Sequence, residues 1–283
     1  MFKRILVAID GSSSSLHALR QAFPLARAEK GAIQVIAVAP PYTGELSLVG
    51  VREHVNDLIV APYQKALDEA LKISESYGVL IRTILEIGEP PETIVDTAED
   101  LDCDLIVVGV RGSNPVKTVL MGSIAARVIG FSHIDVLAVP RGAEIDLNAI
   151  LLAVDGSWSS ERATSIAFEL QKSYGLRLSA LSVADIPSQL YGLDAKVAEQ
   201  MLRQAREVLD PVRTKSEAQG IPVELLLREG DAAEVINQTA KQKSAGMIII
   251  GSHGRTGLKR LLMGSVAERV IGHALCPVLV TRS

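Results

Sequence analysis

The chain has 283 residues, enough for two domains of ordinary size, and it is 48% hydrophobic and 22% charged, as soluble globular proteins are. Its net charge of -4 argues against nucleic acid as a partner of the whole chain. Mean hydropathy is +0.26, yet no apolar run approaches the roughly 18 residues that a membrane-spanning helix needs.

Apolar runs and amphipathic segments alternate along the chain in two successive series. We expect strands at 4–9, 33–38, 80–87, 104–109 and 135–140, and again at 149–154, 176–183, 222–229, 246–251 and 277–282. We expect helices between them at 15–31, 55–77 and 91–100, and at 161–175, 194–219 and 232–243, with one more after each fourth strand. Strands alternating with helices predict an α/β fold, a doubly wound parallel sheet with helices on both faces.

The second series repeats the first. The stretch that starts at Gly109, GVRGSNPVKTVLMGSIAARVIG, matches GSHGRTGLKRLLMGSVAERVIG, which starts at Gly251, without a gap. At the front of each series, ILVAIDGSSSS from Ile5 matches ILLAVDGSWSS from Ile150. A tandem duplication explains ungapped matches in the same order. We therefore predict two domains of one fold, at residues 1–142 and 147–283.

Each fourth strand is followed by the pattern Gly-x-x-Gly, nine residues, then Gly-Ser. Glycines let a ligand approach the main chain closely, and the Gly-Ser pair opens a helix whose first N–H groups have no partner within the helix. An anion satisfies those groups and meets the positive end of the helix dipole. The pattern predicts a phosphate site in each copy, although turning the chain alone would also explain a single such loop. It is neither a Walker A motif nor a Rossmann fingerprint.

An aspartate follows the first strand of each copy, Asp10 and Asp155, within Asp-Gly-Ser. This triplet suits a turn and a helix N-cap. In open α/β sheets ligands bind beyond the carboxyl ends of the strands, where the strand order reverses. If strands one and four are neighbours, the aspartate and the glycine loop face each other across one crevice.

Over nearly its full length, each half resembles a universal stress protein domain, and the whole chain resembles the tandem bacterial members of that family. The glycine pattern is the ATP-binding signature of the family, and the segment from Gly251 is close to its usual wording. The resemblance implies a Rossmann-like five-stranded parallel sheet in the order 3-2-1-4-5. It also implies an adenine nucleotide, ATP with or without Mg²⁺, as the ligand.

The resemblance places the nucleotide residue by residue. In the second copy the matching positions are Val154, Asp155 and Val183 near adenine and ribose, Ile250, Gly251, His253 and Gly254 near the sugar and first phosphates, and Gly264, Ser265 and Val266 at the outer phosphates. In the first copy they are Ile9, Asp10, Val38, Val108, Gly109, Arg111, Gly112, Gly122, Ser123 and Ile124. Arg111 stands where the family has His, and Pro115 removes an N–H donor from the loop. We therefore rank the second site above the first.

The main hypothesis is a nucleotide-responsive stress or regulatory protein that binds ATP. One alternative is a slow ATPase or phosphotransferase, for which the sequence names no metal-holding carboxylate near the loop. The other is an interaction module without nucleotide. The resemblance implies pairing of the fifth strands, 135–140 with 277–282, and a homodimer. The N-terminus shows no signal peptide, and Cys103 and Cys276 form no disulfide framework, so we expect a cytoplasmic protein.

Overall fold

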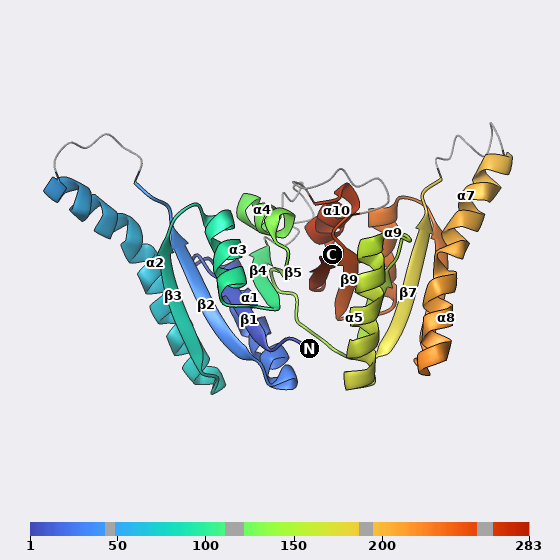
Figure 1. Cartoon of the computed structure of the whole chain (residues 1–283), viewed down its shortest axis with the longest axis horizontal. Helices are drawn as coiled ribbons and strands as arrows, with labels where there is room; N and C mark the ends of the chain where they lie inside the picture. Colours follow the sequence, from blue (N-terminus) through green and yellow to red (C-terminus); the bar gives the residue numbers. More distant parts are fainter. Residues whose placement is uncertain (43–48, 111–121, 187–194, 254–262, 283) are drawn as a thin grey trace. The chain divides into compact units, whose positions relative to one another are not determined.

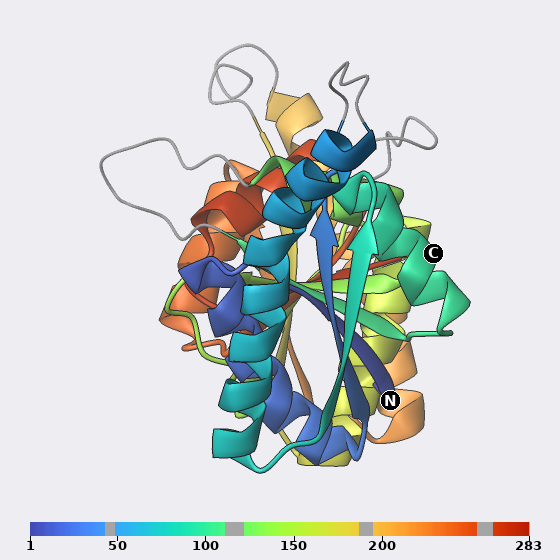
Figure 2. The same cartoon turned by 90° about the vertical axis from the view of Figure 1, so that its left-hand side faces the viewer.

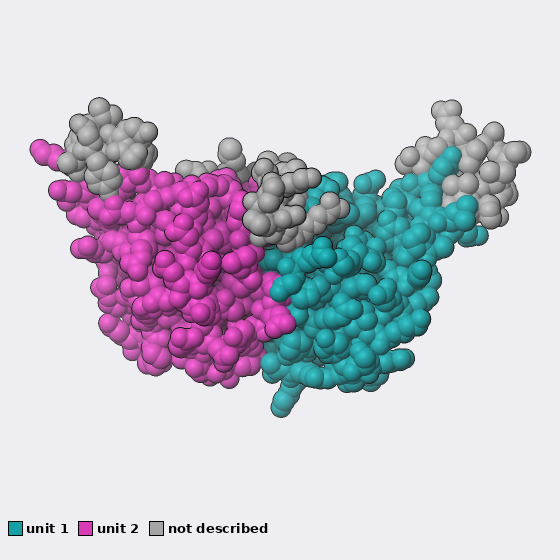
Figure 3. All heavy atoms as spheres, turned by 180° about the vertical axis from the view of Figure 1, so that it is seen from behind, with its two compact units in different colours: residues 1–111, 120–142 teal, residues 112–119, 143–283 magenta. Residues whose placement is uncertain are grey.

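The structure, a computed structural model, describes residues 1–42, 49–110, 122–186, 195–253 and 263–282, with residues 49–56 and 195 described by their backbone alone. The chain divides into two compact units (Figure 3). The first contains residues 1–142 apart from 112–119, and the second contains residues 143–283. Within the described residues, no helix combines the length and the apolar character needed to cross a membrane.

The first unit alternates strands and helices around one parallel sheet (Figure 1). Its elements are β1 (Arg4–Ala8), α1 (Ser13–Glu29), β2 (Ala32–Ala39), α2 (Val49–Tyr77), β3 (Ile81–Ile87), α3 (Pro90–Asp100), β4 (Leu105–Val110), α4 (Ser123–Phe131) and β5 (Asp135–Pro140). The strand order is β3-β2-β1-β4-β5, and every pairing is parallel.

The second unit has the same topology. Its elements are β6 (Ala149–Ala153), α5 (Trp158–Tyr174), β7 (Arg177–Ala184), α7 (Ala195–Glu207), α8 (Leu209–Gln219), β8 (Val223–Glu229), α9 (Ala232–Gln242), β9 (Met247–Gly251), α10 (Ser265–His273) and β10 (Val278–Thr281). The strand order is β8-β7-β6-β9-β10, again parallel throughout. The predicted α/β class and the strand order implied by the resemblance are confirmed in both units.

The strand order assigns the helices to two faces of each sheet. Crossovers between parallel strands are right-handed, so helices on the way out from the central strand cover one face and helices on the way back cover the other. Figure 2 shows this in the first unit, with α2 on one side of β2 and β3 and α3 on the other. In the second unit, α5, α7 and α8 therefore share one face, and α9 and α10 share the opposite face. The order reverses between β1 and β4 and between β6 and β9.

The central strands form the core. The side chains of Leu105, Ile106 and Val107 in β4 and of Ile248 and Ile249 in β9 are fully buried. Such continuous apolar runs are typical of parallel strands covered on both faces. The core therefore fixes the carboxyl ends of β4 and β9, from which both glycine loops start.

The single helix predicted over 194–219 is wrong. The structure has two helices there, which meet at Val208. Pro211 has no N–H to donate to the carbonyl of Glu207, the last residue of α7, which favours a break at this point. The matching helix of the first unit, α2, contains Pro62 and is nevertheless continuous.

Candidate functional site

The turn after the first strand of each unit is built in the same way. The Oδ1 of Asp155 accepts the N–H of Ser157 at 2.9 Å, and the Oδ1 of Asp10 accepts the N–H of Ser12 at 2.9 Å. Ser157 and Ser12 then cap α5 and α1 by accepting the N–H three residues later. The predicted turn and N-cap are confirmed in both copies, and each aspartate lies at the carboxyl end of its sheet.

A cavity of about 170 Å³ lies at the carboxyl edge of the second sheet. The ends of β6, β7 and β9 and the first turns of α9 and α10 enclose it. Nine of the ten residues predicted for this unit line it: Val154, Asp155, Val183, Ile250, Gly251, His253, Gly264, Ser265 and Val266. The tenth, Gly254, lies outside the described residues. The structure therefore brings together residues that are up to 112 positions apart, from 154 to 266.

The first backbone donors of α10 lie at this cavity and have no partner within the helix. Gly264 is the N-cap residue and has no side chain to cap the helix. Its own N–H donates to the carbonyl of Ser252 at 2.9 Å, and the first bond within the helix runs from the N–H of Glu268 to the carbonyl of Gly264 at 3.0 Å. The N–H groups of residues 265–267 precede that bond and so have no partner within the helix. All three residues line the cavity.

Two serines at the start of α5 hold the beginning of the glycine loop. The carbonyl of His253 accepts the hydroxyl of Ser159 at 2.5 Å and that of Ser157 at 3.1 Å. The main chain of Ser159 is fixed in turn, because its carbonyl accepts the hydroxyl of Thr281 in β10 at 3.1 Å. These contacts connect α5, β10 and the loop after β9 in one hydrogen-bond network.

The first glycine of each loop is required for packing. A Cβ on Gly251 would lie 2.4 Å from the Oγ and 2.9 Å from the carbonyl carbon of Ser159, and one on Gly109 would lie 2.5 Å from the carbonyl oxygen of Ser14. Neither glycine has a positive φ. The predicted reason, backbone freedom and close approach of a ligand, needs correction here. The group that comes close to each of these two glycines is the start of α1 or α5, and this contact alone excludes a side chain. A Cβ on Gly122, by contrast, would meet no atom within 4 Å.

The imidazole of His253 has one partner and one unsatisfied nitrogen. Its Nδ1 lies 3.0 Å from the hydroxyl of Ser252. Its Nε2 is buried and has no hydrogen-bond partner among the described residues. A buried polar atom without a partner is costly, so this nitrogen in the cavity lining is suited to a polar ligand atom.

An ion pair braces α10 against α9. The guanidinium of Arg269 donates to both carboxylate oxygens of Asp231, at 2.7 and 2.8 Å, and Asp231 also caps α9 by accepting the N–H of Glu234. These hydrogen bonds, with that from Arg269 the strongest, lower the pKa of Asp231 below its ordinary value. The pair fixes the helix whose N-terminus faces the cavity to its neighbour on the same face of the sheet.

The first unit places its predicted residues at the equivalent edge. Ile9 and Asp10 follow β1, Val38 lies in β2, Val108 and Gly109 lie in β4, and Gly122, Ser123 and Ile124 begin α4. Gly122 is an N-cap without a side-chain cap, as Gly264 is. Arg111 and Gly112 lie outside the described residues, and so does Pro115.

The carboxylate of Asp10 has an additional partner within its turn. The hydroxyl of Ser15 donates to the Oδ1 of Asp10 at 2.7 Å. Burial raises the pKa of Asp10, but the hydrogen bonds from Ser12 and Ser15 outweigh this effect and lower the pKa overall. In the second unit the matching serine, Ser160, donates to the carbonyl of Ser157 at 2.9 Å, a contact that Ser15 also makes with the carbonyl of Ser12 at 3.1 Å. The two turns thus share a backbone but differ in the use of one hydroxyl.

Sequence reasoning missed part of the cavity lining and all of the loop support. Ala232 and Ile236 in α9 line the cavity, and Ser157 and Ser159 hold the loop. One signal was available for α9, because a helix that directly follows a parallel strand begins at the carboxyl edge of the sheet, where ligands bind.

Comparison with known proteins matches both halves of the chain to the same protein family. The model of the universal stress protein family matches residues 1–140 and 147–282. A universal stress protein of Mycolicibacterium smegmatis is 28% identical over 297 residues, which cover 98% of this chain and 96% of that protein. Another, from Methanocaldococcus jannaschii, is 35% identical over 150 residues, 51% of this chain and 88% of that protein. The crystal structure of a universal stress protein from Archaeoglobus fulgidus has the same fold, with a TM-score of 0.75, 23% identity and coverage of 99% of this chain and 98% of that one.

Proposed function

Because the chain belongs to the universal stress protein family, we propose that it is a nucleotide-responsive regulatory protein whose second unit binds ATP in the cavity between β6, β9 and α10. The observation that carries the proposal is the bare N-terminus of α10. Three backbone N–H groups without a helical partner, at residues 265–267, line a cavity at the switch point of the sheet.

The phosphates would occupy the α10 end of the cavity. Backbone N–H groups at a helix start, together with the positive end of the helix dipole, favour an anion. The Ser265 hydroxyl can add a hydrogen bond to a phosphate oxygen. Two hydrogen bonds hold the start of α10 in place, from the N–H of Gly264 to the carbonyl of Ser252 and from Arg269 to Asp231.

The nucleoside would occupy the opposite end. Val154, Leu181 and Val183 give this end apolar walls, which suit the faces of a purine ring. Asp155 is the one acidic side chain among the described residues that line the cavity, and its carboxylate is placed to accept ribose hydroxyls. His253 also lines the cavity, and its unsatisfied Nε2 would receive a hydrogen bond from, or donate one to, the bound nucleotide.

We extend the proposal to the first unit, with lower affinity. Asp10, Gly109 and the start of α4 repeat the arrangement, and Gly122 leaves open space at the helix N-cap. Arg111 and Pro115 are the positions at which this copy departs from the other. Pairing of the fifth strands, a homodimer and a cytoplasmic location stay predictions.

Isothermal titration of the full chain with ATP, with and without Mg²⁺, tests the proposal. The decisive variant is Ser265→Pro. It removes one N–H and the hydroxyl, but proline is favoured at the first position of a helix. The preceding Gly264, with φ -59 and ψ 141, already has the extended conformation that a residue before proline prefers. We expect ATP affinity to fall about tenfold or more, since hydrogen bonds to charged groups are lost.

Two further variants serve as controls. Ser265→Ala removes only the hydroxyl and should weaken binding less. Ser123→Pro makes the same change in the first unit and should leave the tighter site intact. The absence of ATP binding at millimolar concentration in the unmodified chain would contradict the proposal. Release of inorganic phosphate in the same solutions would favour the slow-hydrolysis alternative over binding alone.

A further inference from the structure

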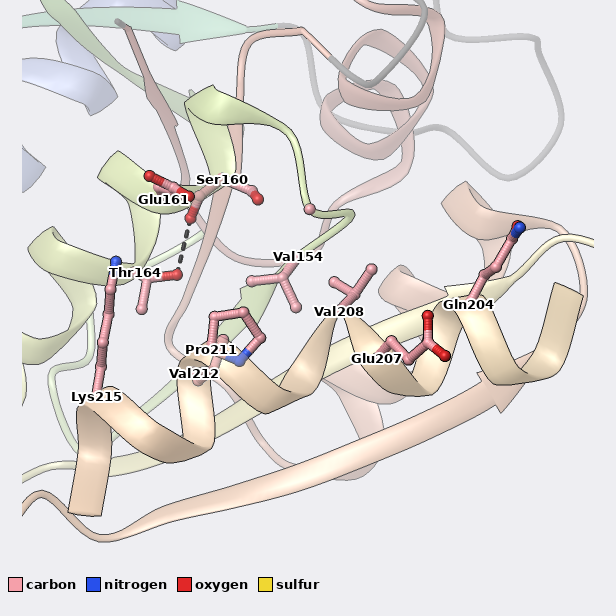
Figure 4. Close-up of a pocket in the computed structure, with 11 residues that line it drawn as sticks. Val154, Ser160, Glu161, Thr164, Gln204, Glu207, Val208, Pro211, Val212 and Lys215 are labelled. Atoms are coloured by element: carbon pink, nitrogen blue, oxygen red, sulfur yellow. Dashed lines mark hydrogen bonds between the residues drawn. The ribbon is translucent and has the colours of Figure 1, made fainter. Parts of the chain in front are cut away.

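A second and larger cavity in the C-terminal unit, about 420 Å³, lies between the start of α5 and the helix pair α7–α8 (Figure 4). It is on the face of the sheet opposite to α9 and α10. Val154, at the end of β6, borders both this cavity and the smaller one described above. A volume of this size is within the usual range for small-molecule sites, about 300–1,000 Å³.

The first unit shows why the cavity forms. There α2 packs directly on the turn after β1, since a Cβ on Gly11 would lie 3.3 Å from the Cβ of Ala66. Ala66 and Ala70 are buried and small, which lets the helix approach closely. At the offset of 142, Val208 and Val212 replace these two alanines, and both line the cavity.

A matching pair of serines supports that alignment. Ser74 in α2 and Ser216 in α8 are both buried, and each donates its hydroxyl to the carbonyl three residues earlier, at 2.8 and 2.7 Å. The larger valines and the break at Val208 therefore account for the space between α8 and the turn after β6. In the first unit, the contact between Gly11 and Ala66 occupies the same place.

The floor of the cavity is apolar and its polar groups are mainly acceptors. Val154, Val208 and Val212 point toward one another across the floor (Figure 4). The hydroxyls of Ser160 and Thr164 are used as donors to main-chain carbonyls, at 2.9 and 2.8 Å, so only their lone pairs remain.

Two carboxylates, Glu161 and Glu207, complete the lining together with Lys215 and Gln204. Neither carboxylate forms an ion pair with another described residue. Lys215 lies in α8, on the opposite side of the cavity from Glu207 at the end of α7 (Figure 4). Glu161 is on the same side as Lys215, whereas Glu207 lies on the other side and forms no ion pair with a described residue (Figure 4).

We propose that this cavity is a second ligand site, which takes a small organic amine with an apolar body. The body packs on the three valines, and the ammonium group donates to the carboxylate of Glu207. A cation is preferred to an anion because the lining carries two carboxylates and one ammonium group. The two cavities share only Val154 in their linings, so the amine would occupy a site separate from that of the nucleotide.

Benzylamine, with benzyl alcohol as the uncharged probe of the same shape, tests the proposal on the full chain by ligand-observed NMR or calorimetry. We expect benzylamine to bind at millimolar concentration or below and benzyl alcohol to bind about tenfold more weakly. Glu207→Gln should weaken benzylamine about tenfold, since it removes a charge-assisted hydrogen bond from an exposed position that the fold does not need. Glu217→Gln, an exposed change on α8 outside the cavity, should have no effect.

Val208→Phe gives a second, steric test, because it fills the cavity from a half-buried position and should abolish binding. Thermal unfolding of this variant shows whether it is folded, and Glu207→Gln decides the question if it is not. Three results would each overturn the proposal: no benzylamine binding, equal affinity for the alcohol, or displacement of benzylamine by ATP in proportion to site occupancy. The last would assign the amine to the nucleotide cavity instead.

Discussion

The turns after β1 and β6 begin with the same three residues, Asp-Gly-Ser, but the hydrogen bonds and the packing around them differ. In the first unit, Ser15 donates to Asp10 and α2 closes over Gly11 through Ala66. In the second, Ser160 donates to the main chain, Ser159 holds the glycine loop, and the space beside Gly156 is a cavity. The duplicated backbone is kept, and single side chains decide what it can bind.

Both copies agree at the first glycine of the loop and differ at the helix that packs on the turn. A Cβ on either Gly109 or Gly251 would lie within 3 Å of a residue at the start of a helix, Ser14 or Ser159. Ala66 and Val208 occupy matching positions, yet Ala66 is buried where α2 packs on the turn, whereas Val208 lines a cavity. The glycine is therefore a requirement of the fold, whereas the side chain at the helix position can differ between the two units.

The largest effect should follow from the shared position. Gly251→Val would place side-chain atoms within 3 Å of Ser159, including a main-chain carbon that cannot move independently of α5. We expect about 3 kcal/mol of destabilisation from overpacking. Chemical denaturation with probes in each unit measures it. Gly109→Val should cost a similar amount in the first unit.

Gly122→Ser is the control for that experiment, because its Cβ meets open space and serine is a good N-cap residue. We expect its stability to stay within about 0.5 kcal/mol of the unmodified chain. A Gly251→Val variant that unfolds at the same denaturant concentration as the unmodified chain would show that the close contact with Ser159 is not required.

A smaller effect should follow from giving the first unit the side chain of the second. Ala66→Val adds two methyl groups where α2 contacts Gly11, at a residue that is 3% exposed. We expect a loss of about 1–2 kcal/mol through overpacking. The same change at Ala61, an exposed residue of α2, should cost much less. Unchanged stability in Ala66→Val would mean that the helix can shift outward without cost, and side-chain size would not explain the cavity.

The sequence predicted the fold well because its signals are local or repeated. The apolar runs at 104–109 and 246–251 are buried strands, and continuous apolar runs are what two-sided burial produces. The duplication and the glycine spacing located the carboxyl edge of each sheet. Nine predicted residues therefore line one cavity, although no local pattern shows how closely they converge.

The parts that were missed depend on contacts between distant residues. Ser159 and His253 are 94 positions apart, and a run of serines after Asp-Gly indicates only a turn and a cap. The break between α7 and α8 could not be predicted from Pro211 alone, since Pro62 lies inside a continuous α2. In both cases the packing of neighbouring elements decides the outcome.

The hydrogen bonds from Ser157 and Ser159 to the glycine loop should affect ATP affinity rather than the stability of the fold. Ser159→Ala removes the shorter of the two hydrogen bonds to the carbonyl of His253, while Ser157 can keep the other. We expect ATP affinity to fall about five- to tenfold, which corresponds to one hydrogen bond of about 1 kcal/mol. Calorimetry on this variant and on Ser14→Ala, the matching change in the first unit, gives the comparison. Equal ATP affinity for Ser159→Ala and the unmodified chain would show that these hydrogen bonds do not contribute to ATP binding.

The smallest effect concerns the acid stability of the first unit. The pKa of Asp10 is lowered in the folded chain, so this carboxylate stabilises the fold above its ordinary pKa of about 3.9 and loses that contribution as the pH falls through the lowered value. Ser15→Ala removes the 2.7 Å hydrogen bond and should raise the pKa of Asp10, because one bond to the carboxylate is lost while the effect of burial stays. Carboxyl NMR titration measures the shift, and the exposed Ser13→Ala is the control. If the pKa of Asp10 does not move in Ser15→Ala, the other hydrogen bonds within the turn hold the carboxylate without Ser15. The use of this hydroxyl would then not be a difference that matters between the two turns.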